Sequence, residues 1–456
     1  MKDAQTDPRS LIFIILLGLA AIGSNRAEAA EFEEVSAAPF GTFEGVDYVM
    51  YSGRFVGETS KGAYRMPFEI VAPADPADGN GRVLFEPPHF VYGAAARLGV
   101  IGPELLFGQG FSYAAVGFGD WGFNRLDLAA PDLEVAGAPA GLVPPLDLST
   151  PVIIDIEILD QFTEALTADP MAAGMLGDVS HLHAYGVSQT AGAMLELLYY
   201  HDVSGRFDFT LLHLVVWNLP FGRPEFAPLP VPFVPFDGSE KTIFVETEGD
   251  QLISDSALIR GALAYPEYRL WEVAGSAHLP LTGPVPGLPP GLPLEFNSLD
   301  NLIVARAAFF AGDDWAARGI EPPPSVTLGR DTSGNPDPVY GFPTGIARDA
   351  NGNATGGVRL PSLAVGAYQY IASLPAYLGI PPSGSNLFFS LAGAQLDLTC
   401  MPPSRFRNHG QYVRASAKAA NELRRQRYLL PGDAEALKEA AAASPVGKPG
   451  ACAVTP

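Results

Sequence analysis

From about residue 40, hydrophobic and polar positions along the chain follow two patterns. Short runs rich in Val, Ile, Phe and Tyr predict strands at residues 47–51, 64–71, 82–86, 113–118, 181–185, 209–217, 242–247 and 268–273. Stretches with helical apolar spacing fall between most of the later runs, at residues 94–108, 154–169, 189–201, 254–264 and 300–312. Hairpin-like early strands followed by β-α-β alternation predict a mostly parallel, eight-stranded sheet with helices on both faces.

Three Pro-rich stretches interrupt this alternation, at residues 119–150, 218–238 and 279–296. One interpretation is rigid packing over the ends of the sheet. The other is that these loops wall an apolar pocket above the carboxyl ends of the strands, where open α/β sheets bind ligands. The pattern leaves both interpretations open.

The first 29 residues have the order of an export signal. Lys2 and Arg9 precede an apolar run at residues 11–22, and Ala-Glu-Ala follows at residues 27–29. The apolar run is too short to span a bilayer. A buried N-terminal helix is the alternative. We therefore expect residues 1–29 to be a signal peptide and the protein to be exported, periplasmic or secreted, without a stable membrane span.

The net charge bears on the binding partners of the protein, and the two cysteines bear on the redox state of its compartment. The chain has 50 acidic and 28 basic residues and a net charge of −22, which repels phosphate backbones and argues against nucleic acid as a partner. Its two cysteines, Cys400 and Cys452, would tend to form a disulfide in an oxidising compartment. A catalytic thiol is the poorer alternative, because both cysteines lie in sequences typical of surface loops.

The residues after 320 have a different character. Asp-Ala-Asn-Gly-Asn at residues 349–353 is similar to a calcium loop but lacks the bidentate Glu, so it predicts a turn and no metal site. Asn353 begins a glycosylation sequon by pattern. Residues 411–428 predict a basic amphipathic helix, which we expect to dock on the acidic body of the protein rather than on a membrane.

The stretch HLHAYGVSQTAG at residues 181–192 passes from a predicted strand into a predicted helix within two residues. Such a sharp turn is typical of a nucleophile elbow, in which a strained serine projects above the sheet. Ser188 occupies the apex. Gly186 and Ala191 are small, as the close approach of strand and helix requires. Thr190 stands where the usual motif has a second glycine.

A serine nucleophile needs a base, and in this architecture the order along the chain is serine, acid, histidine. Of the seven histidines, only His278 and His409 follow the acid-bearing region. His278 comes directly after the last predicted strand, whereas His409 precedes the C-terminal helix and is expected to be structural. His181 and His183 lie within a strand, where packing is the simpler role.

The acid is expected at the end of the preceding strand, in TIFVETEGDQL. Glu246 lies within the strand, Glu248 just past it, and Asp250 in the turn. Asp250 is the favoured acid and Glu248 is the alternative. If Asp250 is the acid, we expect the Glu248 carboxylate to hold the loop by accepting hydrogen bonds from backbone N–H groups. Ser188, Asp250 and His278 are thus ordered as an acyl-transfer triad, in which the histidine moves the serine proton and the carboxylate fixes its tautomer.

The oxyanion formed during acyl transfer needs two hydrogen-bond donors. One is the backbone N–H of Gln189, directly after the serine. The other is expected from the loop after the run at residues 82–86. Two prolines open that loop and have no N–H, so His89 or Phe90 supplies the first available donor.

These residues are similar to the motifs of a known protein family. It resembles the α/β-hydrolase superfamily, and within it the "alpha/beta hydrolase domain" group of carboxylesterase-like proteins, in the stretches NGRVLFE, LLFGQGFSYAAVGFGDWG, GVSQTAG, VETEGD, EVAGSAH and GNATGGVRLPSLAV. The resemblance implies an α/β-hydrolase fold and ester hydrolysis. The chain has PPHF where the family carries an Asn-Arg-Gly type of loop, so the resemblance does not identify the second oxyanion donor. We expect a hydrolase domain at residues 30–319 and a C-terminal extension at residues 320–456 packed on it.

The leading hypothesis is a serine esterase that cleaves small-molecule or polymeric carboxylic esters without a metal or organic cofactor. A polyester depolymerase or an amidase would use the same triad. A non-catalytic binding protein with a hydrolase fold is an alternative of a different class. Labelling of Ser188 by an organophosphonate distinguishes the enzyme hypotheses from the hypothesis of a non-catalytic binding protein.

Overall fold

The structure, a computed structural model, describes residues 30–89, 100–119, 155–201, 203–215, 241–253, 260–285, 294–379, 391–399 and 405–449. The predicted signal peptide, Phe90, Cys400 and Cys452 lie outside these ranges, as does most of the three Pro-rich stretches. The proposals made for them, including the disulfide and the export of the protein, stay predictions.

A nine-stranded sheet runs through the described part of the chain in the order β1-β2-β3-β5-β4-β6-β7-β8-β9. Its strands are β1 (Glu31–Phe43), β2 (Val46–Thr59), β3 (Gly62–Pro73), β4 (Arg82–Phe85), β5 (Ser112–Val116), β6 (His181–Val187), β7 (Phe209–His213), β8 (Thr242–Thr247) and β9 (Tyr268–Val273). Neighbours from β1 to β5 are antiparallel, and all pairs from β5 to β9 are parallel. The prediction of a mostly parallel sheet is confirmed. The predicted count of eight strands is one short of the nine described, because the eight predicted runs correspond to β2 through β9.

Strand β1 is the one that the sequence pattern does not predict. It pairs with β2 from Glu31 opposite Val56 to Phe43 opposite Val46, and its register shifts near Pro39. Most of its side chains are exposed or half-buried, so no alternation of polar and apolar residues marks it. A proline is tolerated here because β1 is an edge strand.

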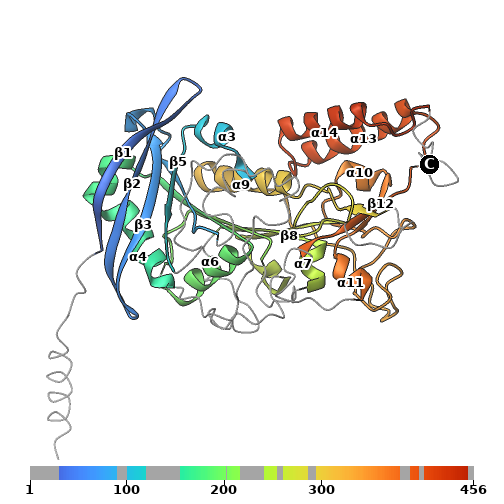
Figure 1. Cartoon of the computed structure of the whole chain (residues 1–456), viewed down its shortest axis with the longest axis horizontal. Coiled ribbons are helices and arrows are strands. Elements are labelled where there is room, and N and C mark those ends of the chain that lie inside the picture. Colours follow the sequence, from blue (N-terminus) through green and yellow to red (C-terminus); the bar gives the residue numbers. More distant parts are fainter. Residues whose placement is uncertain are drawn as a thin grey trace, which may run out of the picture.

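Helices cover both faces of this sheet (Figure 1). One face packs against α3 (Pro103–Phe107) and α9 (Leu302–Arg318), and the other against α4 (Ile156–Ala168), α5 (Pro170–Leu176) and α6 (Gln189–Tyr200). Side chains of β6 alternate accordingly: Tyr185 and Val187 join the core on the α9 side, whereas Leu182 and Ala184 join the core on the α6 side. This alternation is the two-residue period of a strand buried on both faces.

The remaining elements are short, apart from two C-terminal helices. They are η1 (Pro76–Asp78), α7 (Glu248–Ile253), η3 (Ala262–Ala264), β10 (Leu294–Phe296), α10 (Pro361–Ala364), β11 (Tyr368–Ile371), α11 (Leu374–Leu378), β12 (Ala394–Asp397), α13 (His409–Arg425) and α14 (Pro431–Ala443). Strand β12 pairs with both β10 and β11 in a small antiparallel sheet. Because β10 precedes residue 319 and β12 follows it, the small sheet joins the two sides of the predicted domain boundary.

The predicted basic amphipathic helix corresponds to α13. It buries a stripe of Tyr412, Ser416, Ala420 and Leu423, and Leu423 belongs to the same core as β9 and α9. Its basic residues Arg414, Lys418, Arg424 and Arg425 are exposed. The helix therefore docks through its small and apolar side chains, not through its charges. No helix among the described residues has the length and hydropathy needed to cross a bilayer.

The segment at residues 349–353 forms a turn in which the side chain of Asp349 accepts hydrogen bonds from the backbone N–H groups of Asn351 and Asn353, at 2.8 and 3.1 Å. Asn353 is fully buried, and its amide nitrogen donates to the carbonyl oxygen of Tyr368 at 2.8 Å. An enzyme could not reach this amide in the folded protein, so the sequon is not a glycosylation site in this state.

Candidate active site

Ser188 lies at the turn between β6 and α6, with φ 52° and ψ −119°. This positive φ is strained for a residue with a side chain. At Gly186, an added Cβ would lie 2.7 Å from the Cα of Ala191, so only glycine allows α6 to begin this close to the strand. The turn is held to β7 by the Ser188 N–H, which donates to the carbonyl oxygen of His213 at 2.8 Å.

The contacts of Thr190 show what a threonine contributes at the position where the usual motif has a second glycine. Its hydroxyl donates to the carbonyl oxygen of Val187 at 2.9 Å and lies 3.0 Å from the N–H of the same residue. The side chain is completely buried. A threonine at this position thus fastens the first turn of α6 to the end of β6, where a glycine would leave these backbone groups without this contact.

The structure brings Ser188, His278 and Asp250 into one hydrogen-bonded chain. The Nε2 atom of His278 lies 3.0 Å from the Ser188 Oγ, and its Nδ1 atom lies 2.6 Å from an Asp250 carboxylate oxygen. The three side chains follow β6, β8 and β9, at the carboxyl edge of the parallel strands, where such sheets place their ligands. All three residues are buried, and the most exposed, Ser188, retains 8% of its accessible surface.

The carboxylate of Asp250 fixes the tautomer of His278. An ionised carboxylate can only accept hydrogen bonds, so the Nδ1 of His278 carries the proton and its Nε2 faces the serine hydroxyl as an acceptor. The second oxygen of Asp250 accepts from the hydroxyl and the N–H of Thr247, at 2.5 and 3.3 Å. Asp250 lies in the first turn of α7, which begins at Glu248 and which the sequence pattern does not predict. Residues 254–259 of the helix predicted at residues 254–264 lie outside the described residues.

The other two carboxylates near the end of β8 point elsewhere. Glu248 accepts a hydrogen bond from the N–H of Gly275 at 2.8 Å and forms an ion pair with Arg348. Glu246 accepts from the N–H of Val215 at 2.8 Å. Burial, followed by the nearby negative charge of Asp250, raises the pKa of Glu246 well above its usual value. Of these three carboxylates, Asp250 is the one that forms a hydrogen bond with His278 in the described part of the chain.

The expected oxyanion donors are only partly described. Gln189 is the first residue of α6 and is buried, directly after the serine. His89 is buried as well and follows β4, which is the strand beside β6. The segment after β4 therefore leads toward the same edge of the sheet as Ser188. Phe90 lies outside the described residues.

The remaining histidines that the sequence analysis considered have contacts of their own. His409 places its two ring nitrogens 2.8 and 3.0 Å from the carbonyl oxygens of Val446 and Ala442. His183 lies 3.0 Å from a carboxylate oxygen of Asp313. These contacts lie away from the Ser188 chain and tie helices and strands together. No group of three or more potential metal ligands occurs among the described residues.

His213 is a buried residue beside the site that the sequence reasoning missed. Its Nδ1 atom lies 3.1 Å from the hydroxyl of Tyr185, and its Nε2 atom lies 3.0 Å from the side-chain oxygen of Asn301. The amide nitrogen of Asn301 then donates to the carbonyl oxygen of Ala277 at 3.0 Å. This network connects β6 and β7 to the segment that carries His278. No local pattern reveals it, because its members are far apart in the sequence.

Burial lowers the pKa of His213 from 6.5 to about 3. In the unfolded chain this imidazole takes up a proton as the pH falls below about 6.5, whereas the folded protein keeps it neutral until about pH 3. The unfolded state therefore binds more protons in this window, and acid favours unfolding. His213 is expected to remove about 3 kcal/mol from the free energy of unfolding between pH 6.5 and 4.

Replacing His213 with Gln tests this expectation, because the amide can form hydrogen bonds but does not titrate. Urea unfolding at pH 7, 5.5 and 4 measures the free energy of unfolding for both proteins. Wild type should lose more stability than His213→Gln as the pH falls. Parallel pH dependences would show that His213 does not titrate differently in the two states.

A serine at a strained strand-to-helix turn, hydrogen-bonded to a histidine and an acid from later strands of a mostly parallel sheet, defines the α/β-hydrolase class of fold. The sequence pattern of one protein family, described as an alpha/beta hydrolase domain, matches residues 49–439. The chain belongs to this family, and the resemblance seen in the sequence is confirmed. The matched region runs through β2 to β9 and through most of the C-terminal extension.

Three solved structures are similar to parts of the chain and share little sequence with it. The esterase domain of a Rhodothermus marinus protein is 13% identical with a TM-score of 0.34, and the match covers 58% of this chain and 98% of that one. A cold-adapted esterase from an Arctic intertidal metagenomic library is 15% identical, with a TM-score of 0.30 and coverages of 53% and 88%. A bacterial heroin esterase is 12% identical, with a TM-score of 0.28 and coverages of 58% and 80%. A comparison with curated protein sequences gives no match.

Proposed function

We propose that the protein is a serine esterase that cleaves carboxylic esters through Ser188, His278 and Asp250. The observation that supports it most is the position of His278, whose two ring nitrogens lie 3.0 Å from the Ser188 hydroxyl and 2.6 Å from Asp250. A neutral imidazole held in this tautomer is the general base that a serine of ordinary acidity requires. The export of the protein, its signal peptide and its disulfide belong to the same proposal.

In the proposed reaction, the Ser188 Oγ attacks the ester carbonyl carbon and the hydroxyl proton moves to the Nε2 of His278. Asp250 stabilises the imidazolium that results. The carbonyl oxygen, now negative, accepts hydrogen bonds from the Gln189 N–H and from a donor in the segment that starts at His89. Collapse of this intermediate breaks the bond to the alcohol, which takes the proton from Nε2.

A water molecule then goes through the same steps as the serine hydroxyl. It loses a proton to Nε2, attacks the acyl group on Ser188, and releases the carboxylic acid while the proton returns to the serine oxygen. Every proton transfer uses His278, so the proposed chemistry requires neither a metal nor an organic cofactor. A polymeric ester or an amide would react by the same steps, and the rates on esters and amides decide between them.

The proposal is tested by labelling and by turnover. A fluorophosphonate should form one adduct, which peptide mapping by mass spectrometry places on Ser188, and p-nitrophenyl esters of graded chain length should be hydrolysed. Heat-denatured protein is the control, since it lacks the arranged base. Folded protein that forms no Ser188 adduct and cleaves none of these esters would support a non-catalytic binding protein instead.

A further inference from the structure

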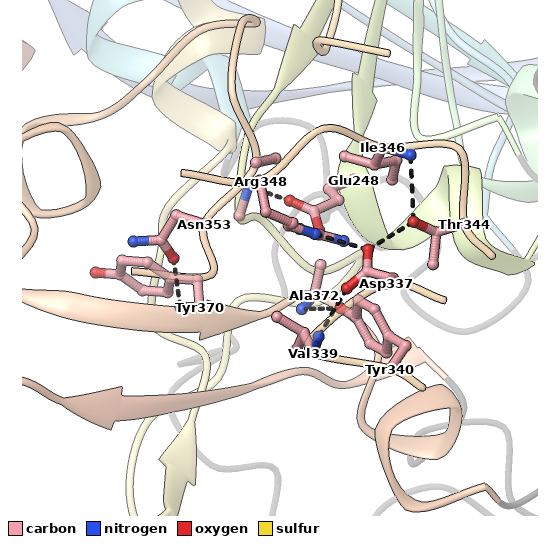
Figure 2. A network of polar contacts seen from close by, with 12 residues as sticks. Glu248, Asp337, Val339, Tyr340, Thr344, Ile346, Arg348, Asn353, Tyr370 and Ala372 are labelled. Carbon is pink, nitrogen blue, oxygen red and sulfur yellow. Dashed lines mark hydrogen bonds and ion pairs between the residues drawn. The ribbon is translucent and has the colours of Figure 1, made fainter. Parts of the chain in front are cut away.

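A buried ion network, formed largely by the C-terminal extension, includes Glu248 at the start of α7 (Figure 2). Arg348 lies between two carboxylates: it forms an ion pair with Glu248, and its Nε donates to Asp337 at 2.8 Å. The three side chains retain at most 4% of their accessible surface. The guanidinium carbon also lies 5.3 Å from the centre of the Tyr340 ring.

Glu248 connects this network to the two segments that carry the acid and the base. It is the first residue of α7, two positions before Asp250. One of its carboxylate oxygens accepts from the N–H of Gly275 at 2.8 Å, three positions before His278, while the other faces Arg348. The single carboxylate of Glu248 thus joins the Asp250 segment, the His278 segment and the extension.

The start of α7 has no room to move toward the base. A Cβ on Gly249 would lie 2.7 Å from the carbonyl oxygen of Ala372 and 3.3 Å from the backbone nitrogen of His278. The N–H of Ala372 in turn donates to the hydroxyl of Tyr340 at 2.9 Å. The residues around Arg348 therefore contact α7 both through Glu248 and through the segment that precedes α11.

Arg348 is itself fixed from the opposite side. Asp337 accepts hydrogen bonds from the N–H of Val339 at 2.8 Å and from the hydroxyl of Thr344 at 2.6 Å, in addition to the Arg348 Nε. Burial alone would lower the pKa of Arg348, but the charge of Glu248 and the hydrogen bonds to Glu248 and Asp337 raise it above its usual value. The cation is thus permanent, and its planar fork directs one N–H to each carboxylate.

We infer that Arg348 is a positioning residue for the Asp250–His278 pair and acts through Glu248. The inference rests on the proposed function for its kinetic consequence but not for its geometry. Without Arg348, the buried carboxylate of Glu248 would lose its cation and would have to take up a proton or water. Either change alters the bond from Glu248 to the N–H of Gly275, and with it the distance between α7 and the His278 segment.

The expected effect is on catalysis and not on substrate binding. Arg348 contacts Glu248, Asp337 and Tyr340 rather than Ser188 or His278, so its loss should leave KM unchanged. A misplacement of about 1 Å at a reacting group can cost on the order of 10²-fold in rate, and Arg348→Met should lower kcat by about 10- to 100-fold. Arg348→Lys keeps the charge but cannot direct two bonds, so its kcat should fall between those of wild type and Arg348→Met.

A matched control comes from Arg82, whose Nη1 lies 2.7 Å from the almost fully buried Asp313. Arg82 begins β4, at the end of the strand opposite to the candidate site. Arg82→Met also deprives a buried carboxylate of its arginine, so it reproduces the loss of stability without touching α7. Melting temperatures of the variants measure that loss, and phosphonate titration gives the number of functional sites in each preparation.

Two readouts separate positioning from stability. The first is kcat per titrated site, which should fall in Arg348→Met and Arg348→Lys and stay at the wild-type value in Arg82→Met. The second is the downfield proton NMR signal of the Nδ1–H of His278, assigned by its absence in His278→Ala. This signal needs no substrate, and it should shift or broaden in both Arg348 variants but not in Arg82→Met.

A wild-type kcat per site together with an unchanged His278 signal in Arg348→Lys would overturn the inference, even if Arg348→Met does not fold. A wild-type protein that hydrolyses no ester would overturn the proposed function alone. In that case the NMR signal still decides whether Arg348 positions the pair: a change in the Arg348 variants supports it, and an unchanged signal contradicts it.

Discussion

Ser188→Ala and His278→Ala are each expected to lower kcat for ester hydrolysis by about 10⁶ while leaving the fold intact. Members of a serine triad act as a unit, and a loss of this size follows removal of either the nucleophile or the base in subtilisin, the reference case for such variants. The expectation depends on the 3.0 Å contact between the Ser188 Oγ and the His278 Nε2. Steady-state rates on one short-chain p-nitrophenyl ester, measured with purified variants, check it.

His409→Ala is the matched control for His278→Ala. It removes an imidazole that contacts two backbone carbonyl oxygens near the ends of α13 and α14, so it can lower the melting temperature without lowering kcat. Circular dichroism should give the Ser188→Ala protein a wild-type spectrum. If Ser188→Ala retains more than roughly a tenth of the wild-type rate, the assignment of the nucleophile is wrong, because the expected loss is far larger.

Asp250→Asn is expected to lower kcat by about 10⁴, the size of the effect when the triad aspartate of a serine protease is changed in this way. The surroundings of Asp250 explain why. Its second oxygen receives two donors from Thr247, so the amide of an asparagine would turn its oxygen toward Thr247 and its NH₂ group toward His278. The imidazole would then have to accept at Nδ1 and carry its proton at Nε2, which is the wrong tautomer for accepting the serine proton.

Glu248→Gln serves as the comparison for Asp250→Asn. The glutamine has one acceptor oxygen where Glu248 meets two donors, from Gly275 and Arg348, so one hydrogen bond is lost. The change disturbs the same link through which Arg348 is inferred to act, so kcat should fall by about 10- to 100-fold, far less than the loss of about 10⁴ expected for Asp250→Asn. Rates of both variants on one ester decide the assignment. A larger loss in Glu248→Gln than in Asp250→Asn would mean that the acid lies two residues earlier.

The parallel part of the fold could be predicted because its strands are buried on both faces. The run at residues 242–247 has Ile-Phe-Val at its centre and a turn after it, and the structure makes the same residues β8. Strand β1 could not be predicted, since an exposed edge strand has no buried face to leave a pattern. The small sheet of β10, β11 and β12 was missed for a related reason: each strand has only three or four residues.

In the candidate site, too, some residues could be predicted from the sequence and others could not. Ser188, Asp250 and His278 are marked locally, each by a turn that follows a strand, and their order along the chain matches a known architecture. Arg348, His213 and Asn301 are marked by nothing local. Arg348 meets Glu248 across 100 positions and His213 meets Asn301 across 88, so only the folded chain shows that these residues support the site.

The pairing of the C-terminal extension with β9 also covers one edge of the main sheet. Strand β9 ends the sheet, and its outer side bonds to the backbone of residues 326 and 358, where the N–H of Glu272 donates to Val326 at 2.9 Å and the N–H of Val358 donates to Glu272 at 2.7 Å. An open strand edge is a template for aggregation. A chain cut after residue 319 would expose that edge together with the ring of Trp271, which now packs against Tyr428. Self-association would then follow from the truncation itself, whatever happens to catalysis.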